Sequence, residues 1–341
     1  MSKRMLFIFS LITVLLLAAC SSGGKDNSTI PTSSSGTSPD GNSMKVTLAG
    51  GSAGGLWSSI GEGIGETIKR TFPGTTFTYQ PGQDGANILT VSSGQANFGL
   101  ISSPAAIWAL EGSEPYTKKF EDIRAVAYLQ AMPYNFLVSE KSGIDSIEQI
   151  VEEKMPFVTS VNTKDGPLEI TNRIVFEAYG TSYEEIEKNG GSIQFIAPTK
   201  VNDQIKDGKM HGATSPQPTP TSSILELSTT EAVKLLSLND KAIKLLEEKV
   251  GAYPYTISKN TYDFLTEDIQ TAAIDMILFS SSNVSDEMVY NVVKSMHENL
   301  DYLHSANKSL EGITDETIAK INGVPLHRGA EKYYKEIGII K

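Results

Sequence analysis

A cluster of glycines early in the chain holds a serine at a spacing that can do chemistry. Residues 50–55 read Gly-Gly-Ser-Ala-Gly-Gly, between an expected strand at 45–49 and an expected helix with Ile60, Ile64 and Ile68 on one face. Glycine lets the backbone approach a ligand closely, and the start of a helix offers free N–H groups to an anion. The turn therefore predicts a ligand site with a preference for negative charge.

The same turn matches a catalytic pattern. Gly50 to Gly54 fit G-x-S-x-G, the nucleophile elbow of α/β-hydrolases, and His327 lies late in the chain, where the order Ser…Asp…His would place the base. An elbow normally follows earlier strands of the sheet, whereas the chain before Lys45 reads as a leader and a tether. A serine hydrolase that uses Ser52 is therefore the alternative from another class of protein.

The sequence contains no clear pattern for binding a metal or a cofactor. The single cysteine excludes a cysteine-built zinc site, and His211, His297, His304 and His327 are scattered. The spacing from Gly50 to Gly55 lacks the Lys and Ser/Thr of a phosphate-binding P-loop. We expect no cofactor, no metal and no catalysis.

The elements that position these residues alternate between strands and helices. This pattern predicts an α/β body with mostly parallel sheets, in which ligands lie beyond the carboxyl ends of the strands. That rule selects the turns at 50–55 and 102–104. Further strands are expected at 126–129 and 136–138, and the segment after residue 255 is expected to be mainly helical, most clearly at 268–279 and 286–302.

Size and charge limit the class of protein. The 341 residues suggest two domains. With 29 basic and 40 acidic residues the net charge is −11, which argues against a nucleic-acid partner.

The N-terminus has the pattern of an export signal. Lys3 and Arg4 precede an apolar run at 5–17, which is too short to span a membrane, and small residues lead to Cys20. The sequence Leu-Ala-Ala-Cys resembles a bacterial lipobox. We therefore expect residues 1–20 to be a lipoprotein signal peptide, Cys20 to be lipidated, and the polar residues 21–43 to form a flexible tether. The protein would be anchored to the cell membrane by lipid alone, facing the extracytoplasmic side.

Several motifs together resemble one known family, the TAXI solute-binding subunits of TRAP (tripartite ATP-independent periplasmic) transporters. The strand, glycine loop and helix at 45–69 resemble the family's opening, and Ser142 to Ser146 resemble the start of its second lobe. Asp207 to Gly212 and the tail Val324 to Tyr334 are similar to later signatures. The resemblance covers nearly all of residues 44–341.

The resemblance implies a fold and a function. The fold would be an α/β, type II periplasmic-binding-protein fold with a ligand cleft between two lobes, 44–138 plus 252–341 and 139–251, closing about a hinge near Val138 and Ala252. The protein would capture a small organic acid or amino acid and deliver it to an integral membrane permease. A receptor for an ABC importer is the nearer alternative.

The implied ligand-binding residues come from both lobes: Gly51, Ser52, Ala53, Gly54, Gly55, Trp57, Asn87, Ser103, Asn162, Thr163, Asp165, Gly166, Pro216, Gln217 and Tyr253. Trp57 is equally compatible with core packing. Where relatives carry Thr and Arg, this chain has Leu168 and Glu169. A second ligand carboxylate would meet Glu169, so we expect one carboxylate on the glycine loop and a neutral or cationic far end. Lys164 or Lys200 is the candidate for an alternative cation.

Overall fold

The computed structural model describes residues 43–341, which belong to one compact unit, Pro39–Lys341. The signal segment, Cys20 and almost all of the tether lie outside the described residues, so the expectations for them remain predictions. Within the described part of the chain, no helix is both long and apolar enough to cross a membrane.

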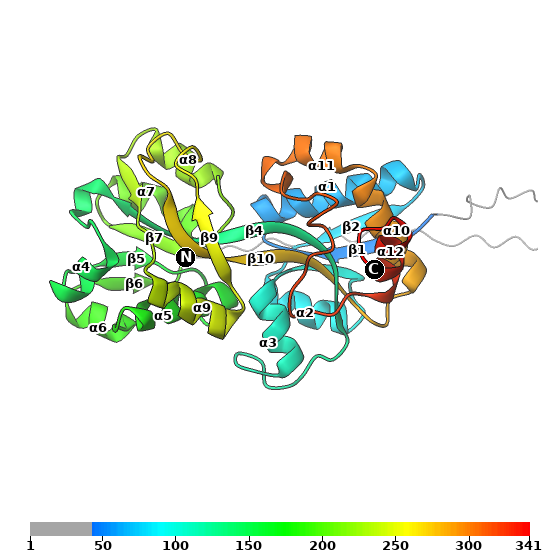
Figure 1. Ribbon diagram of the computed structural model, residues 1–341, viewed down its shortest axis with the longest axis horizontal. Helices are drawn as coiled ribbons and strands as arrows, with labels where there is room; N and C mark the ends of the chain where they lie inside the picture. The colour runs from blue at the N-terminus through cyan, green and yellow to red at the C-terminus, as the bar shows by residue number, and fades with distance from the viewer. Residues whose placement is uncertain (1–42) are drawn as a thin grey trace, which may run out of the picture. The chain divides into compact units, whose positions relative to one another are not determined.

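Ten strands of the described chain form one continuous hydrogen-bonded sheet (Figure 1). Its main path runs β2-β1-β3-β10-β4-β7-β5-β6, with β9 added to β10 and β8 added to β4. The strands are β1 Lys45–Ala49, β2 Thr76–Gln80, β3 Phe98–Ser102, β4 Ile123–Ser139, β5 Val158–Ser160, β6 Ser192–Gln194, β7 Gly212–Pro216, β8 Val233–Leu235, β9 Tyr253–Ile257 and β10 Ile269–Ser281.

The helices pack against this sheet. In chain order they are α1 Leu56–Thr71, α2 Asp84–Ser92, α3 Ser103–Glu111, α4 Ile147–Glu152, α5 Pro167–Ala178, α6 Tyr183–Lys188, α7 Asn202–Lys206, α8 Ser222–Ser228, α9 Asp240–Val250, α10 Asp286–His297, α11 Leu300–Ala306 and α12 Arg328–Glu336. In α1 the expected stripe is the core face, because Ile60, Ile64 and Ile68 are fully buried.

Two lobes share the long strands β4 and β10, which lie side by side in Figure 1. Residues 123–133 of β4 pair with β10, and residues 134–139 pair with β7 and β8. The first lobe carries β1 to β3 with α1 to α3 and α10 to α12, and the second carries β5 to β8 with α4 to α9. The expected α/β fold with two lobes is therefore confirmed.

The expected helix at 268–279 is wrong, because this segment is the strand β10. Almost every residue of its sequence, IQTAAIDMILFSS, is buried, since the strand lies between β3 and β4. Periodicity alone does not separate a fully buried strand from a buried helix.

The two strands expected at 126–129 and 136–138 are one strand, β4. Pro133 suggests a break, since proline removes a hydrogen-bond donor from a ladder. Here Pro133 is the last residue paired with β10, and Tyr134 is the first paired with β7. The proline stands where the strand changes partner.

Two further expectations need correction. The helix expected at 286–302 is divided near Asn299 into α10 and α11. The sheet is mixed rather than mostly parallel: β10 is antiparallel to β3, β4 and β9, and β4 is antiparallel to β7 and β8.

Candidate functional site

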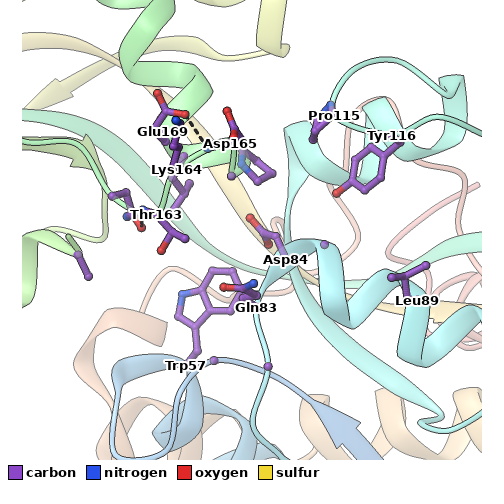
Figure 2. A pocket seen from close by; sticks show the side chains of 18 of the residues that line it. Trp57, Gln83, Asp84, Leu89, Pro115, Tyr116, Thr163, Lys164, Asp165 and Glu169 are labelled. Atoms are coloured by element: carbon purple, nitrogen blue, oxygen red, sulfur yellow. Dashed lines mark hydrogen bonds between the residues drawn. The ribbon is translucent and has the colours of Figure 1, made fainter. Parts of the chain in front are cut away.

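A cavity of about 570 Å³ is lined by loops of both lobes (Figure 2). This volume is typical of sites for small molecules. The lining residues are Gly51, Ser52, Trp57, Gly82, Gln83, Asp84, Gly85, Leu89, Pro115, Tyr116, Thr117, Lys118, Phe120, Asn162, Thr163, Lys164, Asp165, Gly166, Pro167, Leu168, Glu169 and Ala197.

Two helices, α2 and α5, begin among the residues that line this cavity, and α1 begins next to it, one residue before the lining residue Trp57. Their N-caps are Gly55 for α1, Gln83 for α2 and Gly166 for α5, each with an extended backbone and no capping side-chain hydrogen bond. Away from the cavity both kinds of helix start occur: α4, α6, α9, α10 and α12 have an N-cap side chain that accepts a bond from the first turn, and α3, α7, α8 and α11 have none. Helix starts without a side-chain cap offer free N–H groups and a positive dipole end, which favour an anion. Asp84 and Glu169 stand in the first turns of α2 and α5 and offset part of this preference.

Two polar side chains form hydrogen bonds to the backbone of the glycine loop, residues 50–55. The Tyr79 hydroxyl donates to the Gly51 carbonyl over 2.8 Å, and Asn87 Nδ2 donates to the Gly50 carbonyl over 3.2 Å. A Cβ on Gly51 would stand 2.7 Å from Cβ of Trp57, so only glycine fits there. A tyrosine hydroxyl is protonated at neutral pH and can donate, and burial raises the pKa of Tyr79 further, from 10.0 to about 12.

The loop of the second lobe contains two of the three non-glycine residues with positive φ in the described chain, Asn162 at 78° and Asp165 at 57°. Asn162 Oδ1 accepts the Thr163 N–H over 2.8 Å, and its Nδ2 donates to Ser215 Oγ over 3.3 Å. Left-handed residues of this kind are costly and gather at ligand-binding positions. The loop is thus held in a defined shape on the cavity wall.

Glu169 lines the cavity, but its charge is compensated. The carboxylate accepts from Arg173 Nε over 2.9 Å and from an Arg173 terminal nitrogen over 2.8 Å, and it also accepts the Asp165 N–H over 2.9 Å. Arg173 lies one helical turn further along α5. The sequence predicts that Glu169 repels a second ligand carboxylate. Because Arg173 compensates the charge of Glu169, this reason for repulsion no longer holds.

Asp84 is a buried acid on the cavity wall at the start of α2. Its Oδ1 accepts the Ser102 N–H over 2.9 Å and its Oδ2 accepts the Ser102 hydroxyl over 2.8 Å. Burial raises the pKa of Asp84 from 3.8 to about 6, although both bonds from Ser102 act to lower it. Asp84 therefore couples the cavity to the turn between β3 and α3.

The cavity brings together seven of the residues expected to bind ligand: Gly51, Ser52, Trp57, Asn162, Thr163, Asp165 and Gly166. Ala53, Gly54 and Gly55 are exposed in the same loop without lining the cavity.

The other expected ligand residues do not line the cavity. Asn87 is buried under the glycine loop, and Pro216 and Gln217 are buried at the end of β7. Ser103 Oγ accepts the Asp275 N–H, and the Tyr253 hydroxyl donates to Asp275 Oδ1 over 2.8 Å. Of the two candidate cations, Lys164 lines the cavity and Lys200 does not.

Sequence reasoning missed the wall formed by α2 and by the loop after α3. Asp84, Leu89, Pro115 and Tyr116 belong to it. One signal was available for Leu89, because it falls outside the buried stripe of Ile88 and Val91 and must therefore face away from the core.

No histidine lines this cavity within residues 43–341. The proposed base of the hydrolase alternative, His327, is buried at the start of α12, where Nδ1 accepts the Gly329 N–H and Nε2 lies 3.1 Å from the Val284 carbonyl. Ser52 therefore lacks the histidine partner that a nucleophile of that class requires.

The two lobes, the shared strands and the cavity between their loops define the class of periplasmic binding folds. The chain belongs to the NMT1-like family, which it matches over residues 48–338.

Solved structures show the same fold. The periplasmic binding protein BugD superposes with a TM-score of 0.54 at 14% identity, covering 86% of this chain and 95% of that one. MatC from Rhodopseudomonas palustris, with bound malate, gives 0.56 at 10% identity, covering 87% and 99%. Rpa4515 of R. palustris, with adipate, gives 0.54 at 12% identity, covering 88% and 96%. At these identities the likeness is one of fold.

Proposed function

We propose that this protein is an extracytoplasmic receptor that captures a small organic acid or amino acid for a membrane permease and catalyses no reaction. The observation that carries the proposal is one cavity of ligand size, lined from both lobes, at which α2 and α5 begin and next to which α1 begins, each without a capping side-chain hydrogen bond. Such an arrangement binds an anion through backbone N–H groups without a dedicated cation. Malate in MatC and adipate in Rpa4515 support the choice of organic acids.

Capture would proceed by closure of the lobes on the ligand. The lobes are proposed as 44–138 with 252–341 and as 139–251, with a hinge near Val138 and Ala252. Packing supports a second lobe that extends past residue 252 as far as β10, because Ile257 and Ile269 share a buried cluster with Val201 of the proposed second lobe.

The proposed transporter is of the TRAP type, with this chain as its TAXI subunit. The family match and the fold support a solute-binding protein of the periplasmic type. The sequence motifs favour a TAXI subunit among such proteins. An ABC importer is the alternative. Neighbouring genes separate the two, because a TRAP system pairs the receptor with a large fused permease and an ABC system adds an ATPase.

The proposed location is the outer face of the cell membrane, with acylated Cys20 as the anchor. The lipobox and the polar tether at 21–43 support this placement. Nothing else in the proposal depends on it.

The binding proposal is tested on the full chain by calorimetry and thermal shift with malate, adipate, glutamate and straight-chain monocarboxylates. A ligand at one hundred times its Kd adds about 2.7 kcal/mol of stability. Trp57 on the cavity wall gives a fluorescence signal for the same titrations. If no carboxylate of any kind binds, the proposal is wrong.

Ser52 distinguishes the receptor from the hydrolase. We expect Ser52→Ala to weaken binding by about 0.5–3 kcal/mol, the range for loss of one hydrogen bond, and a fluorophosphonate probe to leave Ser52 unlabelled. Labelling at Ser52 would favour the hydrolase instead.

A further inference from the structure

One wall of the cavity is apolar and exposed. Leu89, on α2, has 57% of its surface exposed, more than any other large hydrophobic side chain in residues 43–341. Pro115 and Tyr116, in the loop after α3, belong to the same wall, and Leu168 lines the cavity from α5 of the second lobe. A single exposed leucine needs no explanation, but apolar side chains gathered on one wall of a ligand-sized cavity indicate an apolar ligand surface.

A ligand with a second carboxylate would need a cation in the cavity, and the lining offers only weak candidates. Arg173 is bonded to Glu169 and Asp165. The two lysines of the lining are exposed and lie over aromatic rings, with Lys118 Nζ 4.9 Å from the Phe120 ring and Lys164 Nζ 5.5 Å from that of Phe195. Exposed ion pairs add little affinity, so a second negative charge gains little here.

The polar and apolar parts of the cavity lie apart along α2. Asp84 is the first residue of this helix and Leu89 is five residues further, which corresponds to about 7.5 Å along the axis. In Figure 2 Leu89 lies on the opposite side of Gln83 and Asp84 from Trp57. The Tyr116 hydroxyl is buried without a hydrogen-bond partner among the described residues, and in Figure 2 it points toward Asp84.

We propose that the solute is an amphipathic monocarboxylate, with a single acidic head at the helix starts and an apolar tail of several carbons or a ring against Leu89. This inference rests on the proposed receptor function and narrows its substrate class. It also replaces the sequence-based reason for disfavouring dicarboxylates, because the disadvantage now comes from the apolar wall and the missing cation rather than from repulsion by Glu169.

The test is a calorimetric series on the full chain with monocarboxylates from acetate to octanoate, matched dicarboxylates of equal length, and octanamide as the neutral head. Each added methylene that reaches the wall should lower Kd about four-fold until the groove is full. Octanoate should bind at least about ten-fold more tightly than octanamide, since hydrogen bonds to a charged head are stronger.

Two leucine variants give the matched comparison. Leu89→Ser should raise the Kd of octanoate about ten-fold and leave that of acetate unchanged. Leu225→Ser removes another exposed leucine, on α8, and should change neither value. The acetate measurement separates loss of the wall from general damage to the site.

The inference on the tail is overturned, with a receptor still in place, by a flat dependence of Kd on chain length or by dicarboxylates that bind more tightly than monocarboxylates of equal length. Equal affinity for octanoate and octanamide would overturn the inference on the head, because the acidic head would then have no site. If neither series binds at all, the proposed function fails with it.

Discussion

Asp84 gives a quantitative test of how charge is arranged around the cavity. Its pKa of about 6 in the folded protein compares with 3.8 for the ordinary group. Between these values the folded state binds the proton more tightly than the unfolded chain does, so stability falls as pH rises from about 4 to about 6 and then levels off. The pKa difference corresponds to about 3 kcal/mol of lost stability at neutral pH.

Asp84→Asn removes this titration while keeping the local contacts. The amide oxygen can still accept the Ser102 N–H, and the amide nitrogen can donate to the Ser102 hydroxyl. We expect the variant to exceed the wild type by up to about 3 kcal/mol at pH 8 and to show no such gain at pH 4. Urea unfolding followed by tryptophan fluorescence from pH 4 to pH 8 measures the difference.

Asp275 is the matched control. Burial raises the pKa of Asp275 to about 6 as well, and it accepts a bond from Tyr253, but it does not line the cavity. Asp275→Asn should therefore reproduce the pH-dependent gain in stability without tightening anion binding at pH 8, whereas Asp84→Asn should do both. A stability difference for Asp84→Asn that is the same at pH 4 and pH 8 would refute the reasoning.

Three further changes test other contacts. Arg173→Met leaves the buried Glu169 carboxylate unpaired, so urea unfolding should show a loss of about 3 kcal/mol, largely restored by adding Glu169→Gln; an unchanged midpoint would contradict the pairing. Tyr79→Phe removes the bond to the Gly51 carbonyl and should cost about 1 kcal/mol of anion binding by calorimetry, and an equal Kd would show that the loop does not need it. Cys20→Ser should release the protein from membranes on fractionation with its Kd unchanged, and continued membrane association would exclude acylation as the anchor.

The fold was predictable where local pattern and tertiary demand agree. The turn at 50–55 and the stripe of Ile60, Ile64 and Ile68 predict a strand, loop and helix, and the structure has them. The pattern failed at β10, where burial on both faces removes the alternation that identifies a strand. It failed also at Pro133, because a change of strand partner is a property of the sheet and leaves no local signal.

The candidate site was predictable in part for the same reason. Glycine loops and helix starts are local features, so Gly51 and Gly166 could be chosen from the sequence. The compensation of Glu169 by Arg173 is an i, i+4 pair that helical spacing could have revealed. Tyr116 lines the cavity because a loop of the first lobe comes close to α2. Such an arrangement is tertiary, so a short stretch of sequence does not reveal it.

The charges of the cavity explain why backbone groups must carry recognition. Its lining contains three acids, Asp84, Asp165 and Glu169, and two lysines; Arg173, outside the lining, pairs with Asp165 and Glu169, so no basic group is in excess, and the whole chain has a net charge of −11. Long-range attraction of an anion is therefore absent, and a field of this sign slows its approach. Helix dipoles act over only about one turn, so they hold an anion once it has entered and discriminate by position rather than by charge count. A receptor built in this way gains selectivity from what surrounds the rest of the solute, and in this protein that surrounding is the apolar wall beside Leu89.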